Sequence, residues 1–345
     1  MKFAIEIIGC QQNEYDASRL AIFLKSAGLI ETTVEDAKVV FILACSVRQT
    51  AVDRIFGRVK NWAKDKSVII TSCLTSEDQR KITDRGAHYW KFGDEESLEK
   101  ILGIKFTKAK SLQLTASNSC YVPIMTGCNN FCSYCIVPHI RGREKSRPVN
   151  EIIKEIKNLI SHFRTGQYGS EKPTITLLGQ NVNSYKFGFA KLLKKNNNLS
   201  GDFEISFMSN HPKDMTEDVI EAIATLAKVK KEIHLPLQSG SDRILKLMNR
   251  PYSAEEYLRL VESLKSKVHK VKITTDIIVG FPGETEEDFQ KTVEICKKVK
   301  YSLAYVNKYS PRKGTATYKF GDPIPWSEKQ RRWKILNELI NNKTE

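Results

Sequence analysis

No run of apolar residues in this 345-residue sequence is long enough to span a membrane, and Glu6 interrupts the first apolar stretch, so no signal-peptide pattern opens the chain. Low-complexity linkers are absent as well. The eight cysteines are too sparse for a secreted disulfide scaffold, and their clustering favours metal ligation over disulfides. We therefore expect a cytoplasmic protein without membrane contact, whose 41% hydrophobic residues suffice for two domains.

Acidic residues are outnumbered by basic ones, which gives a formal net charge of +15. Residues 1–110 carry 18 basic and 15 acidic side chains, whereas residues 111–345 carry 37 and 25. Most of the excess therefore lies in the second part of the chain. A basic field of this size favours RNA or another polyanion as a partner, although a solvated lysine-rich surface would give the same count.

Three cysteines, Cys128, Cys132 and Cys135, follow a strand-like run with the spacing Cys-x-x-x-Cys-x-x-Cys. Three thiolates leave one iron of a 4Fe-4S cube without a protein ligand, and an open iron of this kind chelates S-adenosylmethionine in radical enzymes. The spacing resembles that of the radical SAM superfamily. A zinc site is the alternative, but it needs a fourth ligand, for which His139 is the nearest candidate.

The amino-terminal part alternates apolar strands, at residues 3–8, 38–43 and 67–71, with amphipathic helices at 14–27 and 48–64. This βαβαβ pattern predicts a parallel sheet. A cysteine follows each strand: Cys10, Cys45 and Cys73. Parallel strands would bring all three to one edge of the sheet, so we expect a second cluster with an open iron there. The alternative is three unrelated buried cysteines, the packing role that we assign to Cys120 and Cys296.

From residue 121 onward the sequence predicts six strand-and-helix units and hence a curved parallel sheet or incomplete (β/α) barrel. Irregular sequence between residues 105 and 118 marks the domain boundary, which divides the chain into 1–112 and 113–345 with a final helix at 327–340. The strands are expected at 121–126, 174–178, 203–208, 232–237, 271–279 and 303–309, and helices at 149–163, 216–227, 254–267 and 286–300.

Polar or glycine-containing segments follow all six strands, at the end where barrel enzymes build their active sites. Turns alone do not require amides and a carboxylate there, so these groups could hold a ligand bearing amino, carboxylate, ribose and adenine groups. Each could instead be a turn or helix-capping residue. The candidates are Gln180, Asn181, Asn183, Gln238 and Glu284. Nearby, Arg141, Arg143 and Arg147 could contact phosphate or a cofactor carboxylate, or form salt bridges.

From Met1 to about Trp333 the chain resembles the methylthiotransferases, which join a Rossmann-like three-cysteine domain to a radical SAM incomplete (β/α)6 barrel. The motifs that carry the resemblance are Gly9-Cys10-Gln-Gln-Asn13, Ala44-Cys45-Ser-Val-Arg48, Gly127-Cys128-Asn-Asn-Phe-Cys132-Ser-Tyr-Cys135-Ile-Val-Pro138, Arg141-Gly-Arg-Glu-Lys-Ser-Arg-Pro148, Leu235-Pro-Leu-Gln-Ser-Gly-Ser-Asp242, Met248-Asn-Arg250, Asp276-Ile-Ile-Val-Gly-Phe-Pro-Gly-Glu-Thr285 and Tyr309-Ser-Pro311.

The stretch Leu178-Gly-Gln-Asn-Val-Asn-Ser-Tyr185, followed by Ser209-Asn-His-Pro212, looks like the branch that modifies N6-isopentenyladenosine beside the tRNA anticodon. Insertion of a methylthio group at carbon 2 of that base is therefore the expected reaction. The branches that modify threonylcarbamoyladenosine in tRNA, or an aspartate of a ribosomal protein, remain alternatives. An iron-sulfur electron carrier or an RNA-binding scaffold is a further alternative, although neither needs open irons.

The resemblance implies two 4Fe-4S clusters and S-adenosylmethionine as cofactors. Cys132 would act through the cluster that cleaves S-adenosylmethionine, and Cys45 through the cluster that supplies the sulfur, while Gln180, Asn181, Asn183, Gln238 and Glu284 would bind the cofactor. Implied partners are the anticodon arm of tRNA and an electron donor of the flavodoxin or ferredoxin type, with the enzyme a monomer.

The sequence departs from the family pattern at its end. Family members usually continue into a TRAM-type RNA-binding domain, whereas this sequence stops at Glu345, so we expect weaker or differently oriented tRNA binding. Gln12 and Ala44 also differ from the usual residues, but neither change removes a ligand.

Overall fold

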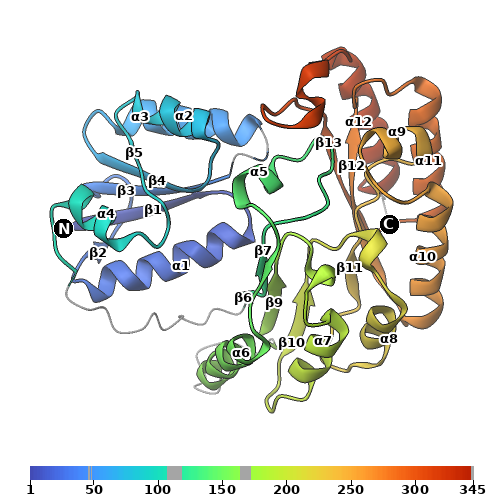
Figure 1. Ribbon diagram of the computed structural model, residues 1–345, viewed down its shortest axis with the longest axis horizontal. Coiled ribbons are helices and arrows are strands. Elements are labelled where there is room, and N and C mark those ends of the chain that lie inside the picture. Colours follow the sequence, from blue (N-terminus) through green and yellow to red (C-terminus); the bar gives the residue numbers. More distant parts are fainter. Residues whose placement is uncertain (46, 48, 107–118, 164–171, 343–345) are drawn as a thin grey trace. The chain divides into compact units, whose positions relative to one another are not determined.

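The computed structural model describes residues 1–45, 47, 49–106, 119–163 and 172–342 (Figure 1). Contacts divide the chain into two compact units, Met1–Ser117 and Asn118–Glu345, and each is described by itself. The boundary expected between residues 112 and 113 lies outside the described residues. Within the described ranges, no helix has the length and apolar character needed to cross a membrane.

The described residues of the amino-terminal unit form a five-stranded parallel sheet in the order β2-β1-β3-β4-β5. The three strands expected from the apolar runs are its central strands, and short strands that the sequence pattern did not predict lie at its two edges. Strand β3 is a continuous buried apolar run, as a central parallel strand requires. The strands are β1 (Lys2–Ile8), β2 (Ile30–Glu31), β3 (Val39–Cys45), β4 (Ser67–Cys73) and β5 (His88–Tyr89).

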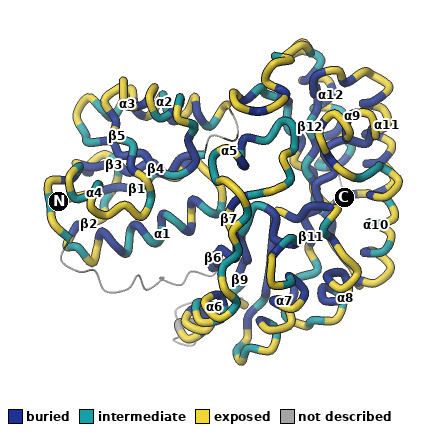
Figure 2. The backbone as a smooth tube through the Cα atoms, in the orientation of Figure 1, coloured by how far each residue is buried: buried dark blue, intermediate teal, exposed yellow. Residues whose placement is uncertain are grey.

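Helices cover both faces of this sheet, and Figure 2 shows the buried strands between them. Leu20 and Leu24 of α1 and Leu98 of α4 pack on one face, whereas Ile55 of α2 and Ile82 of α3 pack on the other. The helices are α1 (Gln11–Ser26), α2 (Gln49–Trp62), α3 (Ser76–Thr83) and α4 (Glu95–Leu102). The expected helix 48–64 is thus confirmed from Gln49 to Trp62, two residues short of its expected end, and residue 48 lies outside the described residues.

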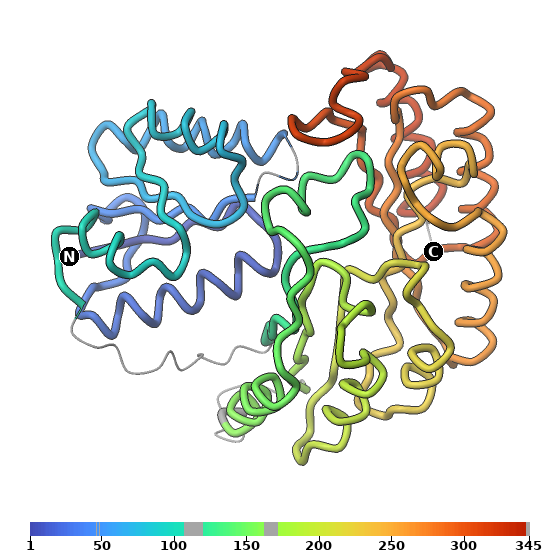
Figure 3. Tube along the Cα trace, viewed as in Figure 1, coloured from blue at the N-terminus to red at the C-terminus, as the bar shows by residue number. Residues whose placement is uncertain are grey.

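In the described part of the second unit, six main strands follow one another around a curved parallel sheet. Figure 3 traces the path of the chain through this unit from green to red. The described strands pair as β10-β9-β6 and β11-β12-β13, and β10 lies beside β11. The strands are β6 (Ser119–Pro123), β9 (Thr174–Leu178), β10 (Glu204–Phe207), β11 (Glu232–His234), β12 (Lys272–Val279) and β13 (Leu303–Lys308). This arrangement confirms the expected incomplete barrel.

Helices alternate with these strands. The bounds of α6, α8, α10, α11 and α12 agree closely with the expected ones, whereas α7 and α9 were not predicted. Helix α10 begins with a capping box between Ser253 and Glu256, and α11 with one between Thr285 and Asp288. The helices are α6 (Val149–Phe163), α7 (Phe189–Asn197), α8 (Glu217–Thr225), α9 (Asp242–Leu247), α10 (Ala254–Lys267), α11 (Glu286–Val299) and α12 (Trp326–Ile340). Helix α8 ends two residues before the expected residue 227.

The expected first strand of the barrel, residues 121–126, is wrong as a single strand. It divides into β6 and β7 (Met125–Thr126), and β7 pairs antiparallel with β8 (Lys145–Ser146). Pro123 has no N–H to donate, and Ile124 makes the last bond to β9 by donating to the Leu178 carbonyl at 2.8 Å. The chain therefore leaves the sheet two residues before the cysteine motif.

Candidate active site

Cys128, Cys132 and Cys135 lie together in the loop between β7 and α5 (Val137–Arg141), and all three are half-buried. We call residues 127–135 the cysteine loop. Gly127 opens it with a φ of 80°, and a Cβ there would approach the Arg143 carbonyl oxygen to 2.1 Å, so only glycine fits. Inside the loop, the Cys135 N–H donates to the Cys132 carbonyl at 2.9 Å. The sequence motif is thus a compact turn that gathers its three thiols.

Residues far along the chain hold the cysteine loop in place. Ser133 donates from its N–H to the Met248 carbonyl at 2.9 Å and from its hydroxyl to the Leu247 carbonyl at 2.7 Å. The Asn249 amide donates to the Phe131 carbonyl at 3.0 Å, and the Thr317 N–H donates to the Ser133 carbonyl at 3.0 Å. The position of the thiols is therefore set by the end of α9 and by the segment after β13.

The electrostatics of the loop disfavour free thiolates. Burial raises the pKa of Cys135 to about 12, with a further contribution from Cys132, and burial also raises the pKa of Cys128. Both thiols are therefore protonated in the apoprotein, and metal ligation would release their protons. Beside them, Nη1 of Arg250 donates to Sγ of Cys132 at 3.5 Å. The sequence marks this arginine within the motif Met248-Asn-Arg250, but it does not predict the contact with Cys132.

Among the described residues, no three His, Cys, Asp or Glu side chains converge on the position of a single metal ion. A 4Fe-4S cube takes each thiolate on a different iron, so its cysteines surround a wide group instead of meeting at one point. The alternative zinc site would have used His139, which is exposed and whose ring contacts that of Phe131 edge-on.

The three candidate residues after β9 make different hydrogen bonds. Gln180 accepts from the Gly127 N–H at 2.6 Å and so braces the cysteine loop. Asn181 donates to Asp214 at 2.7 Å, while its own Oδ1 is buried without a hydrogen-bond partner. Asn183 donates to the His211 carbonyl and accepts from the His211 N–H, both at 3.0 Å. Of these three, Asn181 is the one with an oxygen left for a ligand.

Gln238 follows β11 with a φ of 69°, which is uncommon for a residue other than glycine. Its backbone donates to the Asp276 carbonyl at 2.8 Å and accepts from the Ile278 N–H at 3.0 Å. The side-chain Oε1 is buried and has no partner. A buried amide oxygen without a partner costs free energy unless something donates to it, so this atom also fits a ligand-binding role.

Two residues that sequence reasoning treated only as a motif, Asn210 and His211, belong to the same set. Oδ1 of Asn210 and Nε2 of His211 are buried without partners at the end of β10, the strand beside β9. Burial lowers the pKa of His211 to about 2, helped by the charges of Arg250 and Lys213. Nδ1 accepts from the Lys213 N–H at 3.3 Å, so the proton of the neutral ring lies on Nε2. This Nε2–H group has no acceptor among the described residues.

These four unpartnered groups lie at the carboxyl ends of β9, β10 and β11, three successive strands of the barrel sheet. Three are amide oxygens that accept, and one is an imidazole N–H that donates. S-Adenosylmethionine carries hydroxyl and amino groups that donate and a carboxylate and ring nitrogens that accept, so the set fits this cofactor.

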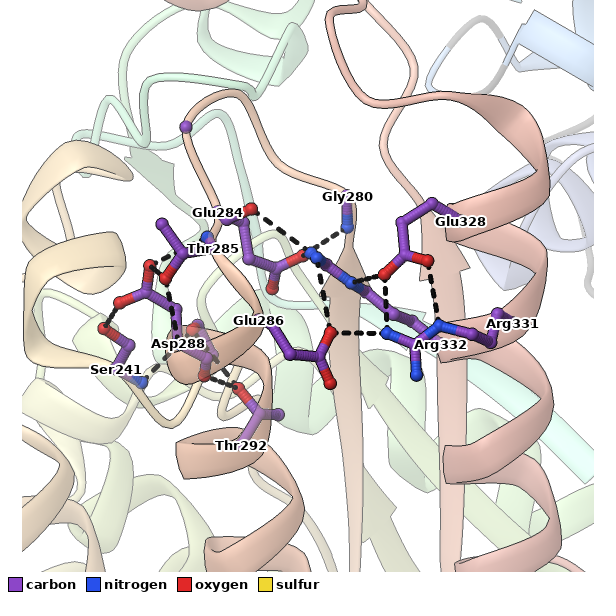
Figure 4. Close-up of polar contacts among 12 residues, drawn as sticks. Ser241, Gly280, Glu284, Thr285, Glu286, Asp288, Thr292, Glu328, Arg331 and Arg332 are labelled. Carbon is purple, nitrogen blue, oxygen red and sulfur yellow. Dashed lines mark hydrogen bonds and ion pairs between the residues drawn. The ribbon is translucent and has the colours of Figure 1, made fainter.

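Glu284 faces into the protein, as Figure 4 shows. Its Oε2 accepts from the Gly280 N–H at 2.6 Å and from Nη1 of Arg332 at 2.7 Å, and its side chain is 1% exposed. Arg332 comes from α12 and is further held by Glu328. In the structure, Glu284 thus joins the loop after β12 to the last helix, and cofactor contact by this residue stays a prediction.

The three arginines after the cysteine loop also differ. Arg147 donates to the Pro123 carbonyl at 2.6 Å and pairs with Glu155 at 2.7 Å, which is the salt-bridge alternative. The exposed guanidinium of Arg143 lies 4.2 Å from the centre of the Phe131 ring. Arg141 is half-buried. Arg143 is therefore the arginine most open to an external anion.

In the amino-terminal unit, topology gathers Cys10, Cys45 and Cys73 as expected. Cys45 and Cys73 are direct partners on the adjacent strands β3 and β4, and Cys10 follows β1 on the other side of β3. Asn13 joins the ends of β1 and β3: its Oδ1 accepts from the Cys10 N–H at 3.1 Å, and its Nδ2 donates to the Ala44 carbonyl at 3.1 Å. The Cys10 thiol donates to the same Oδ1 at 3.3 Å.

Comparison with known proteins identifies the family to which the chain belongs. The Radical SAM superfamily model matches residues 122–296, and that of the uncharacterized protein family UPF0004 matches residues 2–91. The tRNA-2-methylthio-N(6)-dimethylallyladenosine synthase of Clostridium tetani is 40% identical over 99% of this chain and 82% of its own length. The protein of the same name from Clostridium perfringens is 40% identical, with the same coverage. The chain belongs to the radical SAM methylthiotransferase family.

Membership in this family makes the chain an enzyme and implies S-adenosylmethionine and a 4Fe-4S cluster as cofactors. Two solved structures share the fold. The radical S-adenosylmethionine methyltransferase TsrM from Kitasatospora setae has a TM-score of 0.66 at 11% identity, covering 92% of this chain and 77% of its own. The cobalamin-dependent S-adenosylmethionine radical enzyme OxsB has a TM-score of 0.59 at 12% identity, covering 99% and 55%.

Replacing Asn13 by alanine should destabilise the sheet edge that carries Cys10, Cys45 and Cys73. Asn13 is fully buried, and its loss leaves the Cys10 N–H and the Ala44 carbonyl unpaired, which should cost about 1–3 kcal/mol of unfolding free energy. After reconstitution, the variant should also retain less iron, as measured by iron and sulfide analysis. Gln12→Ala removes only a side-chain bond to Asp16 in the same turn and should change stability by less than about 0.5 kcal/mol. Equal stability and iron content in the two variants would contradict this role.

Replacing Arg332 by methionine should destabilise the barrel by about 3–5 kcal/mol at neutral pH, because Glu284 is left charged and buried. Burial already raises the pKa of Glu284 above its usual 4.5, while the bonds from Gly280 and Arg332 oppose that rise. The loss of unfolding free energy should shrink as the pH falls through the raised pKa of Glu284. It should largely vanish below 4.5, where this carboxyl is neutral in both the folded and the unfolded protein.

Denaturant unfolding at several pH values measures this effect. Arg331→Met, which removes a guanidinium on the same helix whose side chain is 44% exposed, should cost less than about 1 kcal/mol. A deficit in Arg332→Met that is independent of pH would mean that lost packing, not the charge of Glu284, is the cause.

Proposed function

We propose that this enzyme inserts a methylthio group at carbon 2 of N6-isopentenyladenosine beside the anticodon of tRNA. The observation that carries the proposal is the 40% identity, over 99% of the chain, to proteins named tRNA-2-methylthio-N(6)-dimethylallyladenosine synthase. The three-thiol loop beside unpartnered polar groups supports the radical part of the reaction. The partner is then the anticodon arm of tRNA, which the net charge of +15 would attract.

When bound at Cys128, Cys132 and Cys135, a 4Fe-4S cluster supplies the electron that splits S-adenosylmethionine into methionine and a 5′-deoxyadenosyl radical able to take the hydrogen from carbon 2. The protein's own part is positioning. Gln180 braces the cysteine loop, and the bonds of Ser133 fix its far side. The thiols are therefore held before the cofactor arrives.

The unpartnered groups at the strand ends would orient S-adenosylmethionine. Oδ1 of Asn181 and Oε1 of Gln238 accept from its amino group or ribose hydroxyls, and Nε2–H of His211 donates to its carboxylate or to a ring nitrogen. Asn183 supports this arrangement indirectly by fixing the backbone of His211.

Cys10, Cys45 and Cys73 would hold a second 4Fe-4S cluster, which would supply the sulfur that is transferred, and a further S-adenosylmethionine would supply its methyl group. Support comes from the adjacency of their three strands and from the bonds of Asn13. We further propose that a flavodoxin- or ferredoxin-type protein delivers the electrons and that the enzyme acts as a monomer in the cytoplasm.

Nucleoside mass spectrometry of tRNA from host cells with and without the gene tests the substrate. We expect 2-methylthio-N6-isopentenyladenosine to disappear and its unthiolated precursor to accumulate in cells without the gene. Complementation with the intact gene should restore the modified nucleoside. Loss of the methylthio form of threonylcarbamoyladenosine instead would point to the other tRNA branch, and unchanged tRNA would point to a protein substrate.

Substitutions in the two groups of cysteines test the division of labour. Cys132→Ala should abolish 5′-deoxyadenosine formation, whereas Cys45→Ala should retain cofactor cleavage but give no methylthiolated product. Each variant should lose about half of the iron and sulfide, because one of two clusters is affected. Cys296→Ala is the control: it replaces a buried cysteine of α11 that belongs to neither group, and it should keep full iron content. Equal loss of both activities in the two cluster variants would contradict separate roles.

A further inference from the structure

Arg250 is a buried guanidinium that lies against the cysteine loop. It is 7% exposed, and each of its nitrogens donates to a different group. Nε donates to the Tyr252 hydroxyl at 2.9 Å, Nη2 to the Pro236 carbonyl at 3.0 Å and Nη1 to Sγ of Cys132 at 3.5 Å. None of these partners is a carboxylate, and among the described residues no carboxylate forms an ion pair with Arg250.

Other buried cations of the barrel are compensated differently. Arg332 pairs with Glu284, and the fully buried amino group of Lys329 pairs with Asp322. A buried charge without a counter-ion costs several kcal/mol, so a negative group is expected beside Arg250 when the enzyme is in its working state. The group that the structure offers is Cys132, a candidate cluster ligand that is negative once it is deprotonated and metal-bound.

The position of this charge is fixed by two sets of bonds. The preceding residues, Leu247 to Asn249, accept from or donate to the cysteine loop, so Arg250 and the thiols move together. On the other side, the Tyr252 hydroxyl donates to the Leu237 carbonyl at 2.9 Å while it accepts from Nε of Arg250. The guanidinium is therefore preorganised and cannot swing away to solvent as the charge of its neighbour changes.

We propose that Arg250 is the counter-ion of the 4Fe-4S cluster on Cys128, Cys132 and Cys135 and raises the reduction potential of that cluster. A fixed positive charge and an N–H bond to a ligand sulfur both stabilise the form that has gained an electron, because that form is more negative. Arg250 is a positioning residue in this sense: it eases reduction of the cluster without touching the substrate. The inference rests on the cluster assignment in the proposed function.

The first test is a potential titration followed by electron paramagnetic resonance. It uses the full chain with Cys10, Cys45 and Cys73 changed to alanine, so that the remaining signal comes from the cysteine loop. Arg250→Met should shift the midpoint to more negative potential. At the midpoint of the parent protein, the ratio of reduced to oxidised cluster should fall about tenfold, which corresponds to about 59 mV for one electron.

Arg259→Met is the matched control. Its guanidinium is on the exposed surface of α10 and pairs with Glu255 one turn away, so its loss should leave the midpoint unchanged. An unchanged midpoint in Arg250→Met, with the cluster intact, overturns the proposal. Absence of any 4Fe-4S signal in the parent protein would instead refute the cluster assignment itself, so the two failures are distinguishable.

The second test measures how far cluster loading raises the melting temperature of the otherwise unaltered enzyme. Arg250 is uncompensated in the apoprotein and compensated in the loaded protein, so the rise should be smaller in Arg250→Met than in the parent. A purely structural arginine would lower both melting temperatures equally, and that result counts against the proposal.

If Arg250→Met does not fold, Arg250→Lys and Arg250→Gln replace it. Both keep an N–H donor, but only lysine keeps the charge. The proposal expects the lysine variant to stay near the parent midpoint and the glutamine variant to shift to more negative potential. The same midpoint in both would overturn a role for the charge.

Discussion

In both units a parallel sheet brings the carboxyl ends of its strands to one edge, and the candidate ligands of this chain depend on that constraint. The strands β1, β3 and β4 are neighbours in the amino-terminal sheet, so cysteines separated by about thirty residues in sequence come together without any local motif. In the barrel, the amides that follow β9, β10 and β11 meet in the same way. Neither site could form in a sheet of mixed direction, because alternate strands would present their amino ends.

A second constraint is that buried charges and polar groups need partners, and the barrel satisfies it in two distinct ways. Glu284 and Arg332 satisfy each other within the protein, and so they join the loop after β12 to the last helix. Oδ1 of Asn181 and Oε1 of Gln238 instead have no partner within the described residues, and Arg250 has hydrogen-bond partners there but no carboxylate to balance its charge. This difference distinguishes residues that stabilise the fold from residues that are candidates for binding a cofactor, although both kinds are buried.

Sequence reasoning predicted most of the elements and the grouping of the cysteines, because these follow from local patterns and from strand direction; that the cysteines hold clusters stays a prediction. Apolar period gives the strands, capping residues give the starts of α10 and α11, and the spacing of Cys128, Cys132 and Cys135 sets their loop. It failed where a contact is long-range. Glu284 and Arg332 are 48 residues apart, and Arg250 and Cys132 are 118 apart. No period or motif in one sequence records such a pairing, and the split of the first barrel strand at Pro123 was missed although proline should have warned of it.

The backbone conformation marks the candidate sites in a way that the sequence does not show. Seven described residues other than glycine have a positive φ, and five of them stand at the candidate sites: Ser72, Phe131, Ser209, Gln238 and Asn249. Such conformations cost about 1–3 kcal/mol each and persist only where the surroundings enforce them. Each of these five residues changes the direction of the backbone within or next to the cysteine loop or at the end of a strand. The chain leaves the regular strand there, where the candidate ligands stand. The strain is therefore concentrated at the sheet edges that carry the candidate ligands, while the strands and helices behind them remain regular.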